Sequence, residues 1–252
     1  MDLKNNRSTT PFIGIIMLDT VFPRIKGDIG NPATFDFPVK YKIVKGASPE
    51  RVVLQADKSL LQPFVAAGRS LIRDGAFALA TSCGFLALFH RELTQALDVP
   101  IYSSSLLQVH FAQSIIKKGQ KTGIITARKR SLTRDHLAAV GIEHYPLTIV
   151  GMEEAEEFTS VFIQGKSTLD ADKCRQEMKE TALALKASNP DLGAIVLECT
   201  NMPPYTQTVH RATGGLPVFD VVTMVNYAHS AGMAVSQDYS VCNNLDNSGK
   251  GV

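Results

Sequence analysis

Apolar segments of strand length recur along the chain and alternate with stretches that show helical periodicity. This alternation is typical of parallel sheets covered by helices, so the sequence predicts the α/β class with two sheets of four strands. The expected strands lie at 12–17, 40–45, 76–82, 100–102, 121–126, 146–150, 194–198 and 217–219. The expected helices lie at 49–73, 84–97, 104–118, 130–140, 168–188, 203–213 and 221–232.

One connection is unusually long. The segment 21–39 contains three prolines and two glycines, which predicts a loop in place of a crossover helix. A loop of this length is usually functional or mobile. The polar ends of the chain, 1–10 and 243–252, are expected to be flexible tails.

The two halves of the chain resemble each other. In the first half a strand runs into 81–84 (TSCG), and Pro100 follows Cys83 by 17 residues. In the second half a strand runs into 198–201 (ECTN), and Pro217 follows Cys199 by 18 residues. Two such α/β units in tandem should face each other across a crevice at the carboxyl ends of their strands, where ligands bind.

Charge and composition exclude several classes of protein. Lys and Arg number 26 against 24 Asp and Glu, so the net charge of +2 does not suggest a nucleic-acid partner. The apolar run 12–18 is too short for a signal peptide or a membrane span, which predicts a cytoplasmic protein without a membrane partner. The four cysteines have no CxxC spacing, so we expect free thiols and no metal site.

Cys83 and Cys199 are the candidate catalytic residues. Each lies where a strand passes into a helix, so helix N–H groups and the positive end of the helix dipole should favour the thiolate. A single cysteine at the end of an apolar strand is more often a buried structural residue. Two at equivalent places in a duplication favour function, whereas Cys174 and Cys242 have no such counterpart and are expected to be structural.

Two acid/base groups that face each other across a cleft suit racemisation or epimerisation. One thiolate removes a proton from a carbon while the opposite thiol donates one to the other face. The residues require no cofactor, and hydrogen-bond donors around a substrate carboxylate would stabilise the carbanion. Candidate donors at the strand ends, each with helix capping as the alternative role, are Thr20, Thr81, Ser82, Thr126, Ser131, Thr200 and Asn201.

The segments 18–20 (LDT), 81–84 (TSCG), 125–127 (ITA) and 198–201 (ECTN) resemble motifs of the aspartate/glutamate racemase superfamily. This superfamily includes cofactor-independent amino-acid racemases, hydantoin racemases, maleate isomerases and arylmalonate decarboxylases. The resemblance implies two pseudo-symmetric Rossmann-like domains with the active site at their interface and the last helix returning to the first domain. The expected domains are 11–118 plus 221–242, and 119–220.

The resemblance also implies roles for individual residues. Cys83 and Cys199 would be the acid/base pair, and Gly84 would belong to the substrate-binding set. Asp19 would lie near a catalytic cysteine and the substrate amino group, although a turn or helix cap is an equal alternative. A homodimer is expected by analogy with the family.

The motifs depart from those of glutamate and aspartate racemases. Gly84 and Phe85 follow the first cysteine in place of the usual Asn-Thr. Asn201 stands two residues beyond the second cysteine, where His or Glu is usual. We therefore predict a racemase or epimerase of an amino acid or a related carboxylate, without fixing the substrate. The alternatives are a hydantoin racemase, a maleate isomerase, an arylmalonate decarboxylase-like enzyme and a non-catalytic protein that binds a small ligand.

Overall fold

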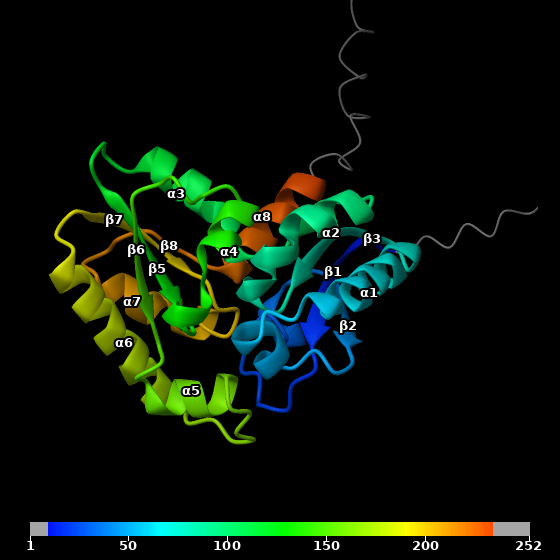
Figure 1. Ribbon diagram of the computed structural model, residues 1–252, viewed down its shortest axis with the longest axis horizontal. Helices are drawn as coiled ribbons and strands as arrows, with labels where there is room; N and C mark the ends of the chain where they lie inside the picture. The colour runs from blue at the N-terminus through cyan, green and yellow to red at the C-terminus, as the bar shows by residue number, and fades with distance from the viewer. Residues whose placement is uncertain (1–9, 234–252) are drawn as a thin grey trace, which may run out of the picture.

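Two parallel sheets form the centre of the structure, a computed structural model in which residues 10–233 are described (Figure 1). The first sheet has the order β2-β1-β3-β4 and the second has the order β6-β5-β7-β8. The two orders are equivalent, so the predicted α/β fold with two sheets of four strands is confirmed. The strands are β1 Phe12–Leu18, β2 Val39–Val44, β3 Ala76–Thr81, β4 Ile101–Tyr102, β5 Lys121–Thr126, β6 Leu147–Gly151, β7 Leu192–Leu197 and β8 Val218–Phe219.

The central strands are continuous apolar runs because helices cover both faces of their sheets. All seven residues of β1 and all six of β7 are buried. Strands that are buried on both faces carry no polar alternation. Each observed strand begins and ends within two residues of its predicted bounds.

Eight α-helices and several short helical turns surround the sheets in the described part of the chain (Figure 1). The α-helices are α1 Leu61–Arg73, α2 His90–Ala96, α3 Val109–Ile115, α4 Arg134–Ala139, α5 Glu156–Phe162, α6 Ala171–Ser188, α7 Thr206–Ala212 and α8 Val221–Met233. The short turns are η1 Pro32–Thr34, η2 Glu50–Leu54, η3 Lys58–Leu60, η4 Gly84–Phe89, η5 Ser105–Gln108, η6 Lys129–Ser131 and η7 Pro203–Tyr205. Among residues 10–233, no helix is both long and apolar enough to cross a membrane.

Two helical segments differ from the prediction. The helix expected at 49–73 is interrupted after η2, where Ala56 has a φ of 49° and Asp57 caps the next turn through its side chain. Helix α5 was not predicted at all. Phe158, Val161 and Phe162 give α5 a short apolar face that is buried against the core, but seven residues are too few for a clear helical period.

The last helix packs on the first sheet. Val225 and Met224 of α8 belong to the same buried cluster as Ile13 and Ile15 of β1. The predicted domain boundaries remain a prediction. Of the predicted tails only residue 10 falls within the described residues, and Cys242 lies outside them.

Hydrogen bonds join the carboxyl ends of the two sheets. The Ser105 hydroxyl, just after β4, donates to the main-chain oxygen of Leu197 at 2.5 Å. The Thr200 hydroxyl donates to the main-chain oxygen of Ser82 at 2.6 Å. Because both bonds are buried, they hold the two cysteine-bearing strand ends in a fixed relation.

The long loop that was predicted at 21–39 is packed into the protein. Phe22, Ile29 and Phe35 are buried, and the Arg24 guanidinium lies 2.7 Å from the Asp28 carboxylate. The side chain of Asp28 is only 3% exposed. The loop thus adds a charged pair to the region beside the strand ends.

We expect Val225→Ala to destabilise the protein by about 2 kcal/mol, because it removes two methyl groups from a fully buried site between α8 and the first sheet. Urea unfolding measures the change. Leu183→Ala is the control, since Leu183 is 46% exposed and its loss should change the free energy of unfolding by less than about 0.5 kcal/mol. Equal effects of the two substitutions would contradict the observed packing of α8.

Candidate active site

Cys83 and Cys199 lie at equivalent places in the two sheets. Cys83 follows β3 by one intervening residue, and Cys199 follows β7 in the same way. Both line one cavity of about 20 Å³, which is large enough for about one water molecule. The structure therefore brings the two predicted catalytic residues together.

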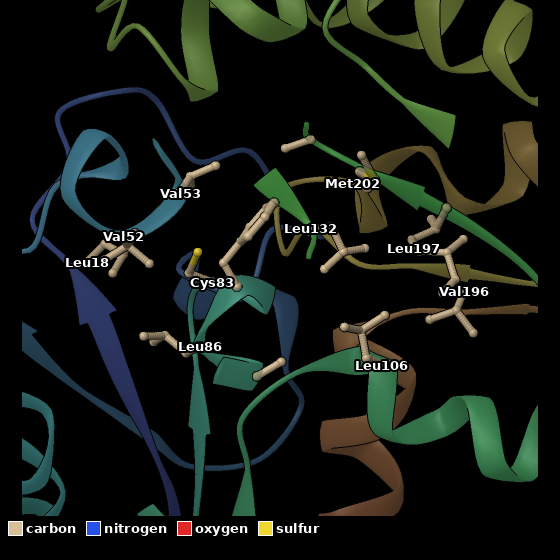
Figure 2. Packing of buried hydrophobic residues seen from close by; sticks show 14 of the residues in the cluster. Leu18, Val52, Val53, Cys83, Leu86, Leu106, Leu132, Val196, Leu197 and Met202 are labelled. Atoms are coloured by element: carbon tan, nitrogen blue, oxygen red, sulfur yellow. The ribbon is translucent and has the colours of Figure 1, made fainter. Parts of the chain in front are cut away.

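The Cys83 thiol lies in apolar surroundings. In Figure 2, Leu18, Val52 and Val53 lie on one side of it and Leu132 lies on the other. Burial raises the pKa of the Cys83 thiol to about 12, and the Glu198 carboxylate acts in the same direction. The backbone N–H groups at the start of η4 and the Arg24 guanidinium oppose this rise.

The Cys199 thiol is also hard to ionise. Burial raises its pKa well above the ordinary value, and the negative charge of Glu198 adds to the effect. The thiol is 3.5 Å from Oδ1 of Asn201, to which it donates a hydrogen bond. The backbone N–H of Asn201 lowers the pKa, while Cys83 and Asp28 raise it further.

The prediction that the helix starts make the cysteines thiolates is therefore wrong, because the net shift of each thiol pKa is upward. The N–H groups of Phe85 and Leu86 do lower the pKa of Cys83, as the sequence suggested. Burial is the larger effect because it removes the thiolate from water. Both cysteines are thus thiols at neutral pH in this structure.

A third acidic group, Glu198, lies beside the cysteines and lines the same cavity. Burial raises the pKa of its carboxyl to about 7. The Thr126 hydroxyl donates to Oε2 at 2.7 Å, and the backbone N–H of Ala127 is a second donor that lowers the pKa. Within the described residues, Oε1 has no hydrogen-bond partner although it is fully buried.

The long loop contributes two further charged groups, Arg24 and Asp28. Arg24 lines the cavity and donates to the Thr20 hydroxyl at 3.0 Å and to Asp28 at 2.7 Å. Asp28 in turn accepts a hydrogen bond from the Asn201 amide at 2.6 Å. This network connects the loop of the first sheet with the strand end of the second.

Three aromatic rings complete the walls, namely those of Phe22, Phe85 and Phe162. The rings of Phe22 and Phe162 meet edge to face at 5.1 Å between centroids. The Arg24 guanidinium lies 4.8 Å from the centroid of Phe22. The cavity therefore combines thiols, one arginine and aromatic surface.

The predicted substrate-binding residues fall into two groups. Those that line the cavity are Thr20, Ser82, Gly84, Thr200 and Asn201. Asp19, Thr126 and Ser131 are not among the residues that line it. Asp19 accepts a hydrogen bond from the backbone N–H of Gly46 and lies 3.6 Å from Lys45, and Thr126 donates a hydrogen bond to Glu198, which does line the cavity.

Three further residues of the site, Arg24, Asp28 and Glu198, are not among the predicted site residues. Arg24 and Asp28 lie in a loop whose path depends on tertiary contacts. In the sequence, only the length of this loop suggests that it is functional. Glu198 had a usable signal, since a charged residue in an otherwise apolar strand end must have a special environment. Cys174 is buried in α6 and lies outside the cavity.

Comparison with known proteins identifies the family. The model of the Asp/Glu/Hydantoin racemase family matches residues 45–225. The chain belongs to this family. The resemblance that the paired cysteine motifs suggested is thus confirmed.

The curated proteins that are similar to it in sequence are named dimethylsulfoniopropionate lyases. The chain is 30% identical to a dimethylsulfoniopropionate lyase of Durusdinium sp. clade D over 85% of this chain and 73% of that protein. It is 29% identical to dimethylsulfoniopropionate lyase 7 of Emiliania huxleyi (strain CCMP1516), over 86% of this chain and 65% of that one. The chain therefore spans about two thirds to three quarters of these relatives.

Solved structures match the fold at low identity. Glutamate racemase isoform RacE1 from Bacillus anthracis aligns with a TM-score of 0.57 and 15% identity, over 90% of this chain and 83% of that one. An arylmalonate decarboxylase aligns with a TM-score of 0.57 and 16% identity, over 88% and 92% of the two chains. Family and fold together support an enzyme of the racemase or isomerase type.

Gly84 is required for the close approach of the two strand ends. A Cβ at this position would overlap both the main-chain oxygen and Oε1 of Glu198. We expect Gly84→Ala to lower the free energy of unfolding by about 1–3 kcal/mol and to reduce turnover, because the two cysteine-bearing ends must separate.

Urea unfolding and the activity assay measure both effects. Gly123→Ala is the matched control, since its Cβ would meet chiefly the leucine side chains of Leu192 and Leu185 outside the cavity. If Gly84→Ala left turnover intact while Gly123→Ala abolished it, the close approach would have no role in the site.

Proposed function

We propose that this protein is a lyase that cleaves dimethylsulfoniopropionate to dimethyl sulfide and acrylate. The observation that carries the proposal is the cavity in which two thiols, one arginine and three aromatic rings converge. The names of the relatives support this choice of substrate. The substrate is a zwitterion with a carboxylate at one end and a sulfonium at the other.

The reaction is a β-elimination. A thiolate removes a proton from the carbon next to the carboxylate, so a C–H bond breaks and an S–H bond forms on cysteine. The electron pair of that C–H bond becomes the double bond of acrylate, and the C–S bond breaks with its electron pair leaving on dimethyl sulfide. The net products are one acrylate, one dimethyl sulfide and one proton.

The cavity walls suit both ends of such a substrate. Arg24 and the Thr20 hydroxyl would bind the carboxylate and stabilise the charge that develops on it when the proton leaves. The rings of Phe22, Phe85 and Phe162 would contact the sulfonium methyl groups, because aromatic faces attract such cations. The cavity must widen to admit the substrate, since its volume is about 20 Å³.

A second candidate is two-base racemisation of an amino acid or a related carboxylate, which the equivalent placement of Cys83 and Cys199 favours. Both reactions begin with the same step, proton removal beside a carboxylate. They differ in the need for a second thiol, since only racemisation returns a proton to the opposite face.

Proton NMR in deuterated water separates the two reactions. The purified protein is incubated with dimethylsulfoniopropionate, and in parallel with aspartate, glutamate, hydantoins and arylmalonates. A lyase produces acrylate vinyl signals and a dimethyl sulfide singlet. Deuterium at the α-carbon of an amino acid without these products would support the racemase and contradict the lyase. No change in any of the substrates would support a protein that binds a ligand without catalysis.

We expect the thiols to be required for turnover. If the lyase proposal holds, serine at the position of the attacking thiol should lower kcat by at least about 100-fold, because an alcohol is a far weaker acid than a thiol. Cys83→Ser and Cys199→Ser are compared by release of dimethyl sulfide, with circular dichroism to check folding. Loss of dimethyl sulfide release in one variant identifies the thiol that acts as the base, loss in both shows that the elimination needs both thiols, and full activity in both would contradict thiol catalysis.

We expect Arg24→Lys to raise the KM for a carboxylate substrate about 10-fold, with a smaller change in kcat. Lysine keeps the positive charge beside Asp28 but cannot contact Asp28 and Thr20 with a planar fork. Arg175→Lys is the matched control, because Arg175 is half-exposed and pairs with Asp172. Equal KM values for both variants and the parent protein would contradict a role of Arg24 in substrate binding.

A further inference from the structure

Among residues 10–233, Glu198 is the buried carboxyl that lines the cysteine cavity, and it comes from the second sheet. Its side chain is fully buried, and Oε1 has no hydrogen-bond partner among residues 10–233. A buried acceptor is normally satisfied, so an open one beside reactive groups indicates a chemical task. The other oxygen, Oε2, is held by the Thr126 hydroxyl, which fixes the direction of Oε1.

Oε1 of Glu198 lies close to the chain segments that carry both thiols. Glu198 is the residue before Cys199 in the chain, and a Cβ on Gly84, the residue after Cys83, would overlap Oε1. All four residues line the same cavity. The carboxyl therefore lies at the meeting point of the two cysteine-bearing strand ends.

We propose that Glu198 accepts the proton of a cysteine thiol and so generates the thiolate inside the closed cavity. In this step the S–H bond breaks and an O–H bond forms on the carboxyl, while the negative charge moves from oxygen to sulfur. No other reactant takes part. Glu198 is a positioning residue, since it acts on the substrate only through cysteine, and its role rests on the proposed thiolate chemistry.

Electrostatics agree with this assignment. The carboxyl has a pKa of about 7, whereas the pKa of the Cys83 thiol is raised to about 12. The charge resides on Glu198 above pH 7, and that charge is a cause of the raised pKa of each thiol. A cationic group of a substrate that enters between the thiols would stabilise the thiolate and draw the charge from oxygen to sulfur.

The surroundings of Glu198 contain few other charges. Within residues 10–233, the titratable groups beside it are Cys83, which lies between β3 and η4, and Cys199, which follows it in the chain. Arg24 and Asp28 approach from the loop after β1 and influence Cys83 and Cys199, respectively. Glu198 is thus the group in the cavity for which the raised pKa falls near neutrality.

The test is the rate of alkylation by iodoacetamide as a function of pH, followed for Cys83 and Cys199 by peptide mass spectrometry. In the parent protein the rate should rise with pH as Glu198 ionises and then level near pH 7, because each further thiolate requires the second ionisation. In Glu198→Gln the break near pH 7 should vanish and the rate should rise about 10-fold per pH unit up to pH 10. Glu153→Gln, which alters a carboxylate outside the cavity, should keep the parent profile.

A second variant shifts the break without removing the carboxyl. Thr126→Val deletes the hydrogen bond that lowers the pKa of Glu198, so the break should move to higher pH. A purely structural carboxyl would change the rates equally at every pH. A profile without a break in the parent protein, or one unchanged in Glu198→Gln, would overturn the assignment.

The readout does not depend on turnover. If the alkylation profile follows the expectation but no dimethyl sulfide forms, the role of Glu198 stands and the proposed substrate fails. If dimethyl sulfide forms at a rate that Glu198→Gln does not change between pH 6 and 10, the lyase stands and the role of Glu198 fails.

Discussion

The candidate site depends on the free-energy cost of burying negative charge in the cavity between the two sheets. One carboxyl and two thiols line a single small cavity, and burial is the largest cause of the raised pKa of each. Charges of the same sign this close together cannot all form in a medium that excludes water. Near neutral pH the three groups therefore carry at most about one negative charge, and that charge lies on the Glu198 carboxylate.

The duplicated fold creates this arrangement. Equivalent strand orders place the residues after β3 and β7 at facing sheet edges, and hydrogen bonds from Ser105 and Thr200 hold those edges together. Gly84 allows the edges to approach as far as they do. The symmetry ends there, since the first half adds the loop with Arg24 and the second half adds Glu198.

The sequence predicts what local pattern determines. Apolar runs of strand length predict the eight strands to within two residues, and the repeated cysteine motifs indicate that the two sheets face each other at the candidate site. The pKa of Cys83 was mispredicted because a helix start is visible in sequence, whereas the burial that outweighs it is a property of the assembled fold. Arg24 and Asp28 escaped detection for the same reason, since only folding brings their loop to the strand ends.

Because burial disfavours the thiolate, the charge of the substrate affects how readily a thiolate can form. The cavity already contains one paired cation, Arg24, whose charge is largely balanced by Asp28 at 2.7 Å. A substrate with a carboxylate alone would add negative charge to a site that resists it. A zwitterion brings a compensating cation, which is a sulfonium in the proposed lyase reaction and an ammonium in racemisation of an amino acid. The electrostatics of the cavity therefore favour both of these reactions over chemistry on a purely anionic substrate such as an arylmalonate.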